Sequence, residues 1–431
     1  MTIDTGFVPA TSKFKPEHSP IDVSSKAFWN KTSEERDERF ARLRAEDPVS
    51  WQRPVEDAVA PDPHDPGYWA LVKHADIVKV SRDAKTFISG QGVMFDLLAP
   101  MFLEMSQSFL AMDAPRHDYL RRLISSAFTP RRIQRIDEQI QVAAREVVDS
   151  FAGDPSGELE FVSQCAELLP VRLFCDMFGV PGELREQTAQ AAADIVSWAD
   201  PEALARRSPA EIQLGAAEVL HGIAARIIAE RRKDPADDLF TNLVQAEVDG
   251  ERLTDAEIGS FFVLLSVAGT DTTKHTSSLT VKAMTDFPDQ REWLREDYDN
   301  RIRTAVEEFV RYASPVMTFR RTAVEEVELG GKKIIPGDKV VLFYPSGNRD
   351  ADVFAEPDRF DLSRDPNPHV GFGGGGAHFC LGNQLAKGAL RALFREVLTR
   401  IPDFEAGTPD LLGTNFMRGV KRLPFRFTPE R

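Results

Sequence analysis

Hydrophobic positions recur at three- and four-residue spacing along most of the chain, which is the pattern of amphipathic helices. The segments with this spacing lie at 35–46, 116–127, 133–152, 159–178, 209–232, 255–286, 300–312 and 383–400. Runs typical of strands are few and short, at 68–72, 326–329, 339–343 and 422–427. The pattern therefore predicts a mainly α protein with small β-sheets.

The segment 255–286 departs from the pattern of an ordinary core helix. A capping box from Thr254 to Glu257 fixes its start and Pro288 fixes its end, while 258–268 is nearly all apolar. The next five residues, 269–273, read Gly-Thr-Asp-Thr-Thr. A helical glycine costs about 1 kcal/mol against alanine, and buried polar groups need partners. We therefore expect the helix ladder to open here, beside a functional pocket.

A long irregular segment leads to the third cysteine. Residues 345–379 show neither the helical nor the strand pattern of apolar residues. They end in the glycine-rich run Gly-Phe-Gly-Gly-Gly-Gly-Ala-His-Phe at 371–379. A coil of this length in a compact protein needs a functional or structural reason. Cys380 follows it, and the helical pattern resumes at once, so Cys380 lies at a predicted helix N-terminus. Such a position favours an anion and would stabilise a thiolate.

The length of 431 residues would allow two domains, but no linker, repeat or low-complexity tract divides the chain. We expect a loosely ordered tail over 1–20 and one domain over 21–431. The N-terminus has no signal-type apolar run, and no stretch of 18 uninterrupted apolar residues predicts a membrane span. Three cysteines argue against a disulfide framework and for a cytoplasmic protein, with Cys165 and Cys175 as core filler.

The net charge of −15 disfavours nonspecific binding to nucleic acid or to anionic lipid. One segment differs from this average, because 115–135 carries six arginines and a single acid. The arginines are Arg116, Arg121, Arg122, Arg131, Arg132 and Arg135. A solvated helix face explains this patch as well as a dock for an acidic partner or an anionic cofactor group does.

Four motifs together resemble the signature set of the cytochrome P450 family, over about residues 20–428. They are the glycine-rich loop with His378 to Gly382, the run Ala268–Thr272, Glu308 with Arg311, and Pro357–Phe360. Each motif alone is weak, but their order and spacing are specific. The resemblance implies the cytochrome P450 fold, an α-rich prism with haem b between a long distal helix and the cysteine loop.

The resemblance assigns a role to each matching residue. Cys380 matches the thiolate that ligates the iron, and Asp271 and Thr272 match the acid–alcohol pair that delivers protons during dioxygen activation. Thr272 could instead only bond a carbonyl one turn earlier. The residues that match propionate and other cofactor contacts are His117, Arg121, Ala268, Arg321, Phe372, His378 and Gly382. The residues that match the buried ion-pair network are Glu308, Arg311 and Arg359.

The glycine-rich loop departs from the family pattern by one residue. The family places its phenylalanine seven residues before the cysteine, whereas Phe372 lies eight before Cys380. Gly376 rather than Gly375 fits the later spacing. The extra residue leaves the role of Phe372 open and does not affect that of Cys380.

A closer resemblance is to actinobacterial, especially mycobacterial, enzymes that hydroxylate methyl-branched lipids or the sterol side chain at a terminal carbon. It rests on 247–253, 305–316 and 367–382. The apolar segment 93–110 agrees with a hydrophobic substrate, although the same residues could be ordinary core. The predicted pocket residues are Met94, Phe95, Leu264, Val316, Met317 and Phe416.

The resemblance leaves three classes of haem protein to compare. A monooxygenase uses O2 and electrons, a peroxygenase uses peroxide, and a gas-binding haem protein performs no oxidation. The acid–alcohol pair favours the monooxygenase, because neither alternative needs it. No flavin or nucleotide fingerprint follows the haem region, so we expect a ferredoxin and a ferredoxin reductase to supply the electrons.

Overall fold

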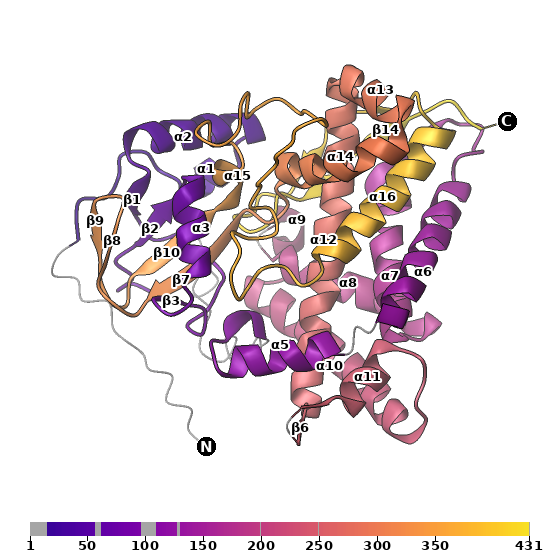
Figure 1. The fold of residues 1–431 in the computed structure, drawn as a ribbon, viewed down its shortest axis with the longest axis horizontal. Coiled ribbons are helices and arrows are strands. Elements are labelled where there is room, and N and C mark those ends of the chain that lie inside the picture. Colours follow the sequence, from indigo (N-terminus) through magenta and orange to yellow (C-terminus); the bar gives the residue numbers. More distant parts are fainter. Residues whose placement is uncertain are drawn as a thin grey trace.

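The computed structural model describes residues 15–56, 62–95, 109–126, 130–198, 200–248 and 250–430. Figure 1 shows a sheet-rich part, formed by the described residues before 96 and the 318–347 region, beside a larger helical part. The α-helices of the described residues are α1 (Lys26–Trp29), α2 (Ser33–Glu46), α3 (His74–Arg82), α5 (Arg116–Ser126), α6 (Pro130–Asp149), α7 (Leu168–Phe178), α8 (Arg185–Val196), α9 (Pro201–Leu204), α10 (Pro209–Lys233), α11 (Leu239–Gln245), α12 (Asp255–Asp286), α13 (Pro288–Glu296), α14 (Tyr298–Ala313), α15 (Tyr344–Gly347) and α16 (Asn383–Arg400). The prediction of a mainly α fold is confirmed.

The strands form one larger sheet and several small ones. The larger sheet has the order β1 (Val49–Gln52), β2 (Tyr68–Leu71), β10 (Lys339–Phe343), β7 (Thr318–Ala323) and β3 (Phe87–Ile88). Only the β10–β2 pair is parallel, with Val341 opposite Ala70. The smaller sheets join β11 (Glu405–Ala406), β14 (Pro424–Arg426) and β4 (Glu158–Glu160), then β12 (Asp410–Leu411) with β13 (Val420–Arg422), β5 (Glu247–Val248) with β6 (Glu251–Arg252), and β8 (Val327–Leu329) with β9 (Lys332–Ile334).

The observed fold has elements that the pattern did not predict, such as α3, α8, α13 and β1, and two further differences have a clear physical reason. The apolar run 159–178 is not one helix: it begins as strand β4, passes through a π-helical turn, η3 (Val162–Ala166), and becomes α7 only at Leu168. Strand β7 was not expected, because its sequence Thr-Phe-Arg-Arg-Thr-Ala places charges where tertiary contacts bury them. Two 3₁₀ turns, η2 (Phe109–Ala111) and η4 (Gly182–Leu184), complete the elements.

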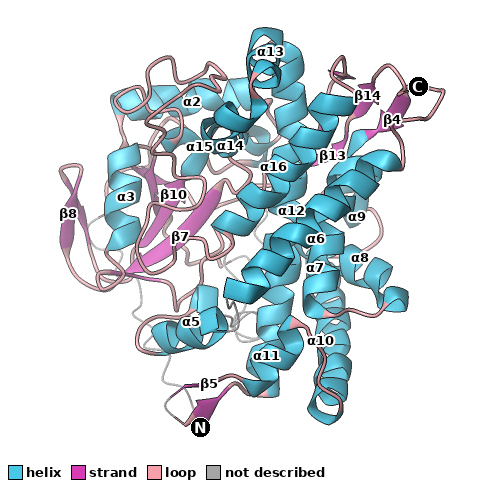
Figure 2. Cartoon of the chain, turned by 45° about the vertical axis from the view of Figure 1, so that its right-hand side comes forward, coloured by secondary structure: helices cyan, strands magenta, loops and turns pink. Residues whose placement is uncertain are grey.

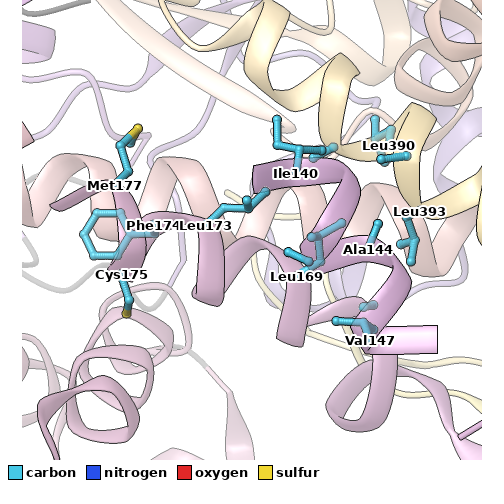
Figure 3. Close-up of a cluster of buried hydrophobic side chains, with 14 of the residues drawn as sticks. Ile140, Ala144, Val147, Leu169, Leu173, Phe174, Cys175, Met177, Leu390 and Leu393 are labelled. Atoms are coloured by element: carbon cyan, nitrogen blue, oxygen red, sulfur yellow. The ribbon is translucent and has the colours of Figure 1, made fainter. Parts of the chain in front are cut away.

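Helices α6, α7 and α16 pack through the largest apolar cluster of the protein. Figure 3 shows Ile140 and Ala144 of α6 between Leu169 of α7 and Leu393 of α16. Figure 2 shows the same helices stacked beside the long α12. Cys175 lies in this cluster, where burial raises the pKa of its thiol to about 11. Cys165 is also buried with a raised pKa, so the prediction that both are core filler is confirmed.

Residues 15–20, which the sequence assigns to the tail, contact the larger sheet. The side chain of Lys15 pairs with the buried carboxylate of Asp338 and lies 4.8 Å from the ring of Trp51. The backbone N–H of Ser19 donates to the carbonyl of Trp51 at 2.7 Å. Residues 15–20 are therefore held against the larger sheet, while 1–14 lie outside the described residues.

Helix α10 is the one helix, within the ranges given above, that is long and apolar enough to cross a membrane by length and composition. This is weak evidence for a span, since the core helix of a soluble protein passes the same test. Helix α10 packs against α8 and α12.

Candidate functional site

The loop before Cys380 is built from glycines that no other residue could replace without strain. Gly373, Gly375 and Gly376 have φ of +93°, +95° and +80°, a region that side chains rarely adopt. A Cβ at Gly376 would also lie 2.5 Å from the carbonyl oxygen of Ser81 on α3. The loop closes where the N–H of Cys380 donates to the carbonyl of Phe372 at 3.1 Å. The longer loop thus still places Phe372 against the cysteine backbone.

Cys380 lies directly before α16, as the sequence predicts. The side chain of Asn383, the first residue of α16, donates to the carbonyl of Cys380 at 2.8 Å. Burial raises the pKa of the Cys380 thiol, and the N–H of Gly382 and the charge of Arg121 oppose this only in part. The helix start alone therefore does not secure a thiolate. A metal ion bound to the sulfur would supply the additional positive charge.

Next to this loop lies a cluster of four basic side chains: His117, Arg121, Arg321 and His378. The rings of His117 and His378 are 4.3 Å apart between centroids. Burial lowers the pKa of His378 to about 3, and the charges of Arg321, His117 and Arg121 add to this effect. The other three groups of the cluster therefore all lie close enough to act on His378.

Several polar atoms of this basic cluster have no partner in the described structure. Nε2 of His117 and Nδ1 of His378 are buried without a hydrogen bond. The guanidinium of Arg321 is buried and donates to the carbonyl of Arg320 at 2.8 Å, and no carboxylate among the described residues pairs with it. Buried polar groups of native proteins have partners. The cluster thus fits a cofactor with carboxylates, and haem has two of them.

Helix α12 runs unbroken from Asp255 to Asp286, so the predicted opening of its ladder is wrong. The polar residues satisfy themselves within the helix instead. The hydroxyl of Thr272 donates to the carbonyl of Ala268 at 2.8 Å, and that of Thr276 donates to the carbonyl of Thr272 at 2.7 Å. The predicted pocket still has a counterpart. Ala268 and Gly269 are exposed in the middle of a core helix, and a Cβ on Gly269 would meet nothing within 4 Å.

Asp271 and Thr272 are neighbours in sequence but have different surroundings. Thr272 is partly exposed beside Ala268, whereas Asp271 is buried and paired with the ammonium of Lys274. The second carboxylate oxygen of Asp271 is buried without a partner. No direct hydrogen bond joins Asp271 to Thr272 in this described part of α12.

The predicted ion pair of α14 is present and fully buried. The guanidinium of Arg311 donates twice to the carboxylate of Glu308, at 2.7 Å each, and to the carbonyls of Asn348, Pro357 and Arg359. The predicted role of the Arg359 side chain is wrong. It is 47% exposed and lies 3.5 Å from Asp289, so Arg359 contributes only its carbonyl. Arg364, 8% exposed and 3.3 Å from Glu308, takes the position as the chain turns after Phe360.

The predicted pocket residues divide into a wall and a core. Val316 and Phe416 are partly exposed and lie side by side, because Val316 bridges to Met417 and Phe416 contacts the ring of Phe319 at 5.8 Å. Met317 and Phe95 are each 3% exposed and pack in the core around α1 and α2, so their assignment to the pocket is wrong.

The reason for this error is the packing just before β7. Met317 packs in the apolar cluster of α1 and α2, whereas Val316 and Phe319 both pack against a second apolar cluster of the larger sheet. Phe319 was missed, although it is apolar and lies on the strand that follows Val316. Leu264 and Met94 are half-buried, and Leu264 lies one turn before Ala268 on α12. Residues 96–108, most of the apolar segment 93–110, lie outside the described residues.

The three described arginines of the 115–135 patch have different surroundings. Arg116 pairs with Glu257 at the start of α12, and Arg121 donates to the carbonyl of Phe379 at 2.7 Å. Arg122 is exposed. The side chains of Arg131, Arg132 and Arg135 lie outside the described residues. Arg116 thus ties α5 to the start of α12 by an ion pair, and Arg121 contacts the cysteine loop.

Comparisons with known proteins agree with this geometry. A family model described as Cytochrome P450 matches residues 68–401. A methyl-branched lipid omega-hydroxylase of Mycobacterium tuberculosis is 39% identical, covering 98% of this chain and 99% of that protein. A steroid C26-monooxygenase of Rhodococcus jostii is 37% identical over 90% of this chain and 80% of that protein. The structure of a Mycobacterium marinum cytochrome P450 in complex with pseudoionone has a TM-score of 0.92 and 53% identity, covering 96% of this chain and all of that one.

Proposed function

Because the chain belongs to the cytochrome P450 family and is a haem-thiolate monooxygenase, we propose that it hydroxylates a branched lipid at a terminal carbon. The substrate would be a methyl-branched lipid or an isoprenoid or sterol side chain. The observation that carries this proposal is the near full-length similarity to relatives named for omega-hydroxylation and for C26 oxidation. The pseudoionone complex of the similar mycobacterial structure also supports a branched isoprenoid.

The residues around the cysteine loop fit haem b. Cys380 would hold the iron, and His117, Arg121, Arg321 and His378 would hold the propionates, which gives their orphaned nitrogens an acceptor. When bound, the haem activates dioxygen and inserts one oxygen atom into a C–H bond, and a thiolate ligand favours O–O cleavage. The exposed strip of Ala268 and Gly269 gives the flat cofactor and its substrate room beside α12.

Thr272 and Asp271 are proposed to supply protons for this reaction. The hydroxyl of Thr272 lies on the exposed side of α12 and can both accept and donate a hydrogen bond. Asp271 lies on the buried side and has an oxygen free of partners. Because no direct bond joins them, a water molecule or a rotation of the Asp271 carboxyl must carry the proton between them.

Terminal hydroxylation requires the pocket to position the substrate. Internal C–H bonds are weaker than terminal ones, so chemistry alone favours attack inside the chain. The apolar wall of Val316, Phe319 and Phe416 would bind the lipid by burial, at about 0.8 kcal/mol per buried CH₂. A methyl branch is wider than a straight chain, so a shaped channel can hold its end in one place.

Electrons are proposed to come from a ferredoxin and its reductase in the cytoplasm. The exposed Arg122 and the ring of Phe379, which is 37% exposed directly before Cys380, offer a basic and apolar surface to a small acidic partner. Phe379 also borders a surface cavity of about 620 Å³, which Arg303, Glu307, His369 and Lys387 help to line.

A screen of substrates tests the proposal. Branched fatty acids, isoprenoids, sterols and straight chains of equal length are titrated, and the shift of the haem absorption that follows loss of the iron-bound water is measured. Products of the reconstituted reaction with ferredoxin, reductase and NADPH are then identified by mass spectrometry. We expect terminal alcohols and a preference for branched chains. Mostly internal alcohols, or a preference for straight chains, would contradict the proposed regiochemistry. The general monooxygenase activity would still stand.

A further inference from the structure

A lysine of α12 joins the buried Asp271 to a residue near the surface. Lys274, one turn after Asp271, pairs with its carboxylate, and its side chain is 11% exposed. The same ammonium lies 4.0 Å from the carboxylate of Glu167, whose side chain is 36% exposed. Three alternating charges therefore connect the interior of α12 with solvent.

Glu167 reaches this position through the π-helical turn η3. The N–H of Glu167 donates to the carbonyl of Val162, five residues earlier, at 2.9 Å. Such turns insert an extra residue, change the direction of the following side chain, and occur frequently at functional sites. Both η3 and α7 pack against α12. The irregular backbone thus places an acid beside Lys274.

The two carboxylates next to Lys274 favour its charged form. Burial opposes the charge of Lys274, but Asp271 and Glu167 outweigh it, so the pKa of Lys274 is raised. The next residue, His275, faces a different element: its Nδ1 accepts the N–H of Val420 on β13 at 3.1 Å. Burial, followed by the charge of Lys274, lowers the pKa of His275 to about 3, so this histidine remains neutral.

We propose that Lys274 is a positioning residue that holds the carboxylate of Asp271 on the α7 side of α12, and that the ion pairs from Glu167 through Lys274 to Asp271 mark the route by which protons enter from solvent. The inference rests on the proposed role of Asp271 and Thr272. Lys274 stays protonated in this step: Glu167 takes up a proton from solvent, and water along the ion pairs carries the proton to the carboxylate of Asp271. Each turnover takes one substrate with its C–H bond, one O2, two protons from solvent and two electrons from the partner protein, and gives one alcohol and one water.

Replacement of Lys274 tests the inference. Lys274→Met removes the charge and keeps the length, whereas Lys274→Arg keeps the charge. The control is Lys282→Met, which removes a similar pair with Asp286, also on α12 but closer to solvent, with side chains 27% and 48% exposed. In Lys274→Met we expect product per NADPH to fall severalfold, peroxide to rise and the solvent deuterium isotope effect to grow. Lys274→Arg should restore most of the coupling, and the control should match the wild type.

Three further measurements separate the proposed role of Lys274 from mere support of the fold. A double-mutant cycle of Lys274→Met with Asp271→Asn, read by chemical unfolding, should show a coupling that Lys282→Met with Asp271→Asn does not. Substrate titration should give the same affinity in Lys274→Met as in the wild type. Glu167→Gln, which removes only the partly exposed charge 4.0 Å from Lys274, should slow turnover a few-fold with a larger solvent isotope effect.

The outcomes distinguish failure of this inference from failure of the proposed function. If Thr272→Ala and Asp271→Asn release peroxide while Lys274→Met and Glu167→Gln remain fully coupled, the route through Lys274 is wrong and the proton role of the pair stands. If Thr272→Ala and Asp271→Asn also remain coupled, the proposed proton role itself is wrong. An Arg variant as uncoupled as the Met variant would likewise overturn the positioning role, because its charge is retained.

Discussion

The glycine-rich loop and the middle of α12 both contain glycine, but the backbone is irregular in the loop and helical in α12. In the loop, Gly373, Gly375 and Gly376 have positive φ and the backbone is irregular. In α12, Gly269 sits in an unbroken helix whose threonine hydroxyls bond the preceding turn. The sequence predicts an irregular backbone at both places, and only the loop has one. A glycine thus serves the loop through its backbone freedom and serves α12 through the space that it leaves open.

The largest effect is expected on the loop side, at Cys380. In Cys380→His a neutral ligand replaces the thiolate, so the reduced carbon monoxide complex should lose the red-shifted Soret band of thiolate-ligated haem and hydroxylation should stop. Absorption spectra and a product assay measure both. A variant that retained the red-shifted band would show that another residue ligates the iron.

The buried ion pair of α14 should have the next largest effect. Arg311→Met leaves the carboxylate of Glu308 buried without its main partner, which costs about 3–5 kcal/mol of unfolding free energy. Arg359→Met is the matched control, because that side chain is exposed and should change stability by less than about 0.5 kcal/mol. Chemical unfolding of both variants measures the difference. Equal losses would mean that the Arg359 side chain, and not only its carbonyl, belongs to the network.

A substitution at Gly376 sharpens the comparison of the two glycine sites. In Gly376→Ala the backbone conformation alone should cost about 1–3 kcal/mol, and the new Cβ would meet the backbone of Ser81 and Arg82. Because the loop carries Cys380, the fraction of protein that retains haem should fall as well. Thermal unfolding and the ratio of haem to protein absorbance measure these losses. A stable, fully loaded variant would show that the loop tolerates another backbone path.

The long helices and the ligand loop could be predicted because local signals specify them. The capping box at Thr254 and Pro288 bracket α12, and the glycines before Cys380 mark a loop whatever surrounds it. Which side chain points to a given partner after a turn could not be predicted in the same way. Whether Arg359 or Arg364 reaches Glu308 depends on how the coil after Pro357 folds back. The pocket assignment of Met317 failed for a related reason, since packing in the apolar cluster of α1 and α2 makes Met317 core.

The smallest effect, and the one that separates the two glycine sites most directly, is expected in Gly269→Ala. Alanine favours a helix over glycine by about 1 kcal/mol, and the added methyl would touch no protein atom within 4 Å. The haem-free protein should therefore become slightly more stable, the opposite of Gly376→Ala. The same methyl would project into the space proposed for cofactor and substrate, so substrate affinity should fall or the oxidised position should move. Chemical unfolding of the haem-free chain, together with substrate titration and product analysis of the loaded enzyme, measures both signs. A loss of stability in the haem-free chain would mean that the helix is strained at Gly269. Gly269 would then resemble Gly376, where glycine is needed for its backbone conformation.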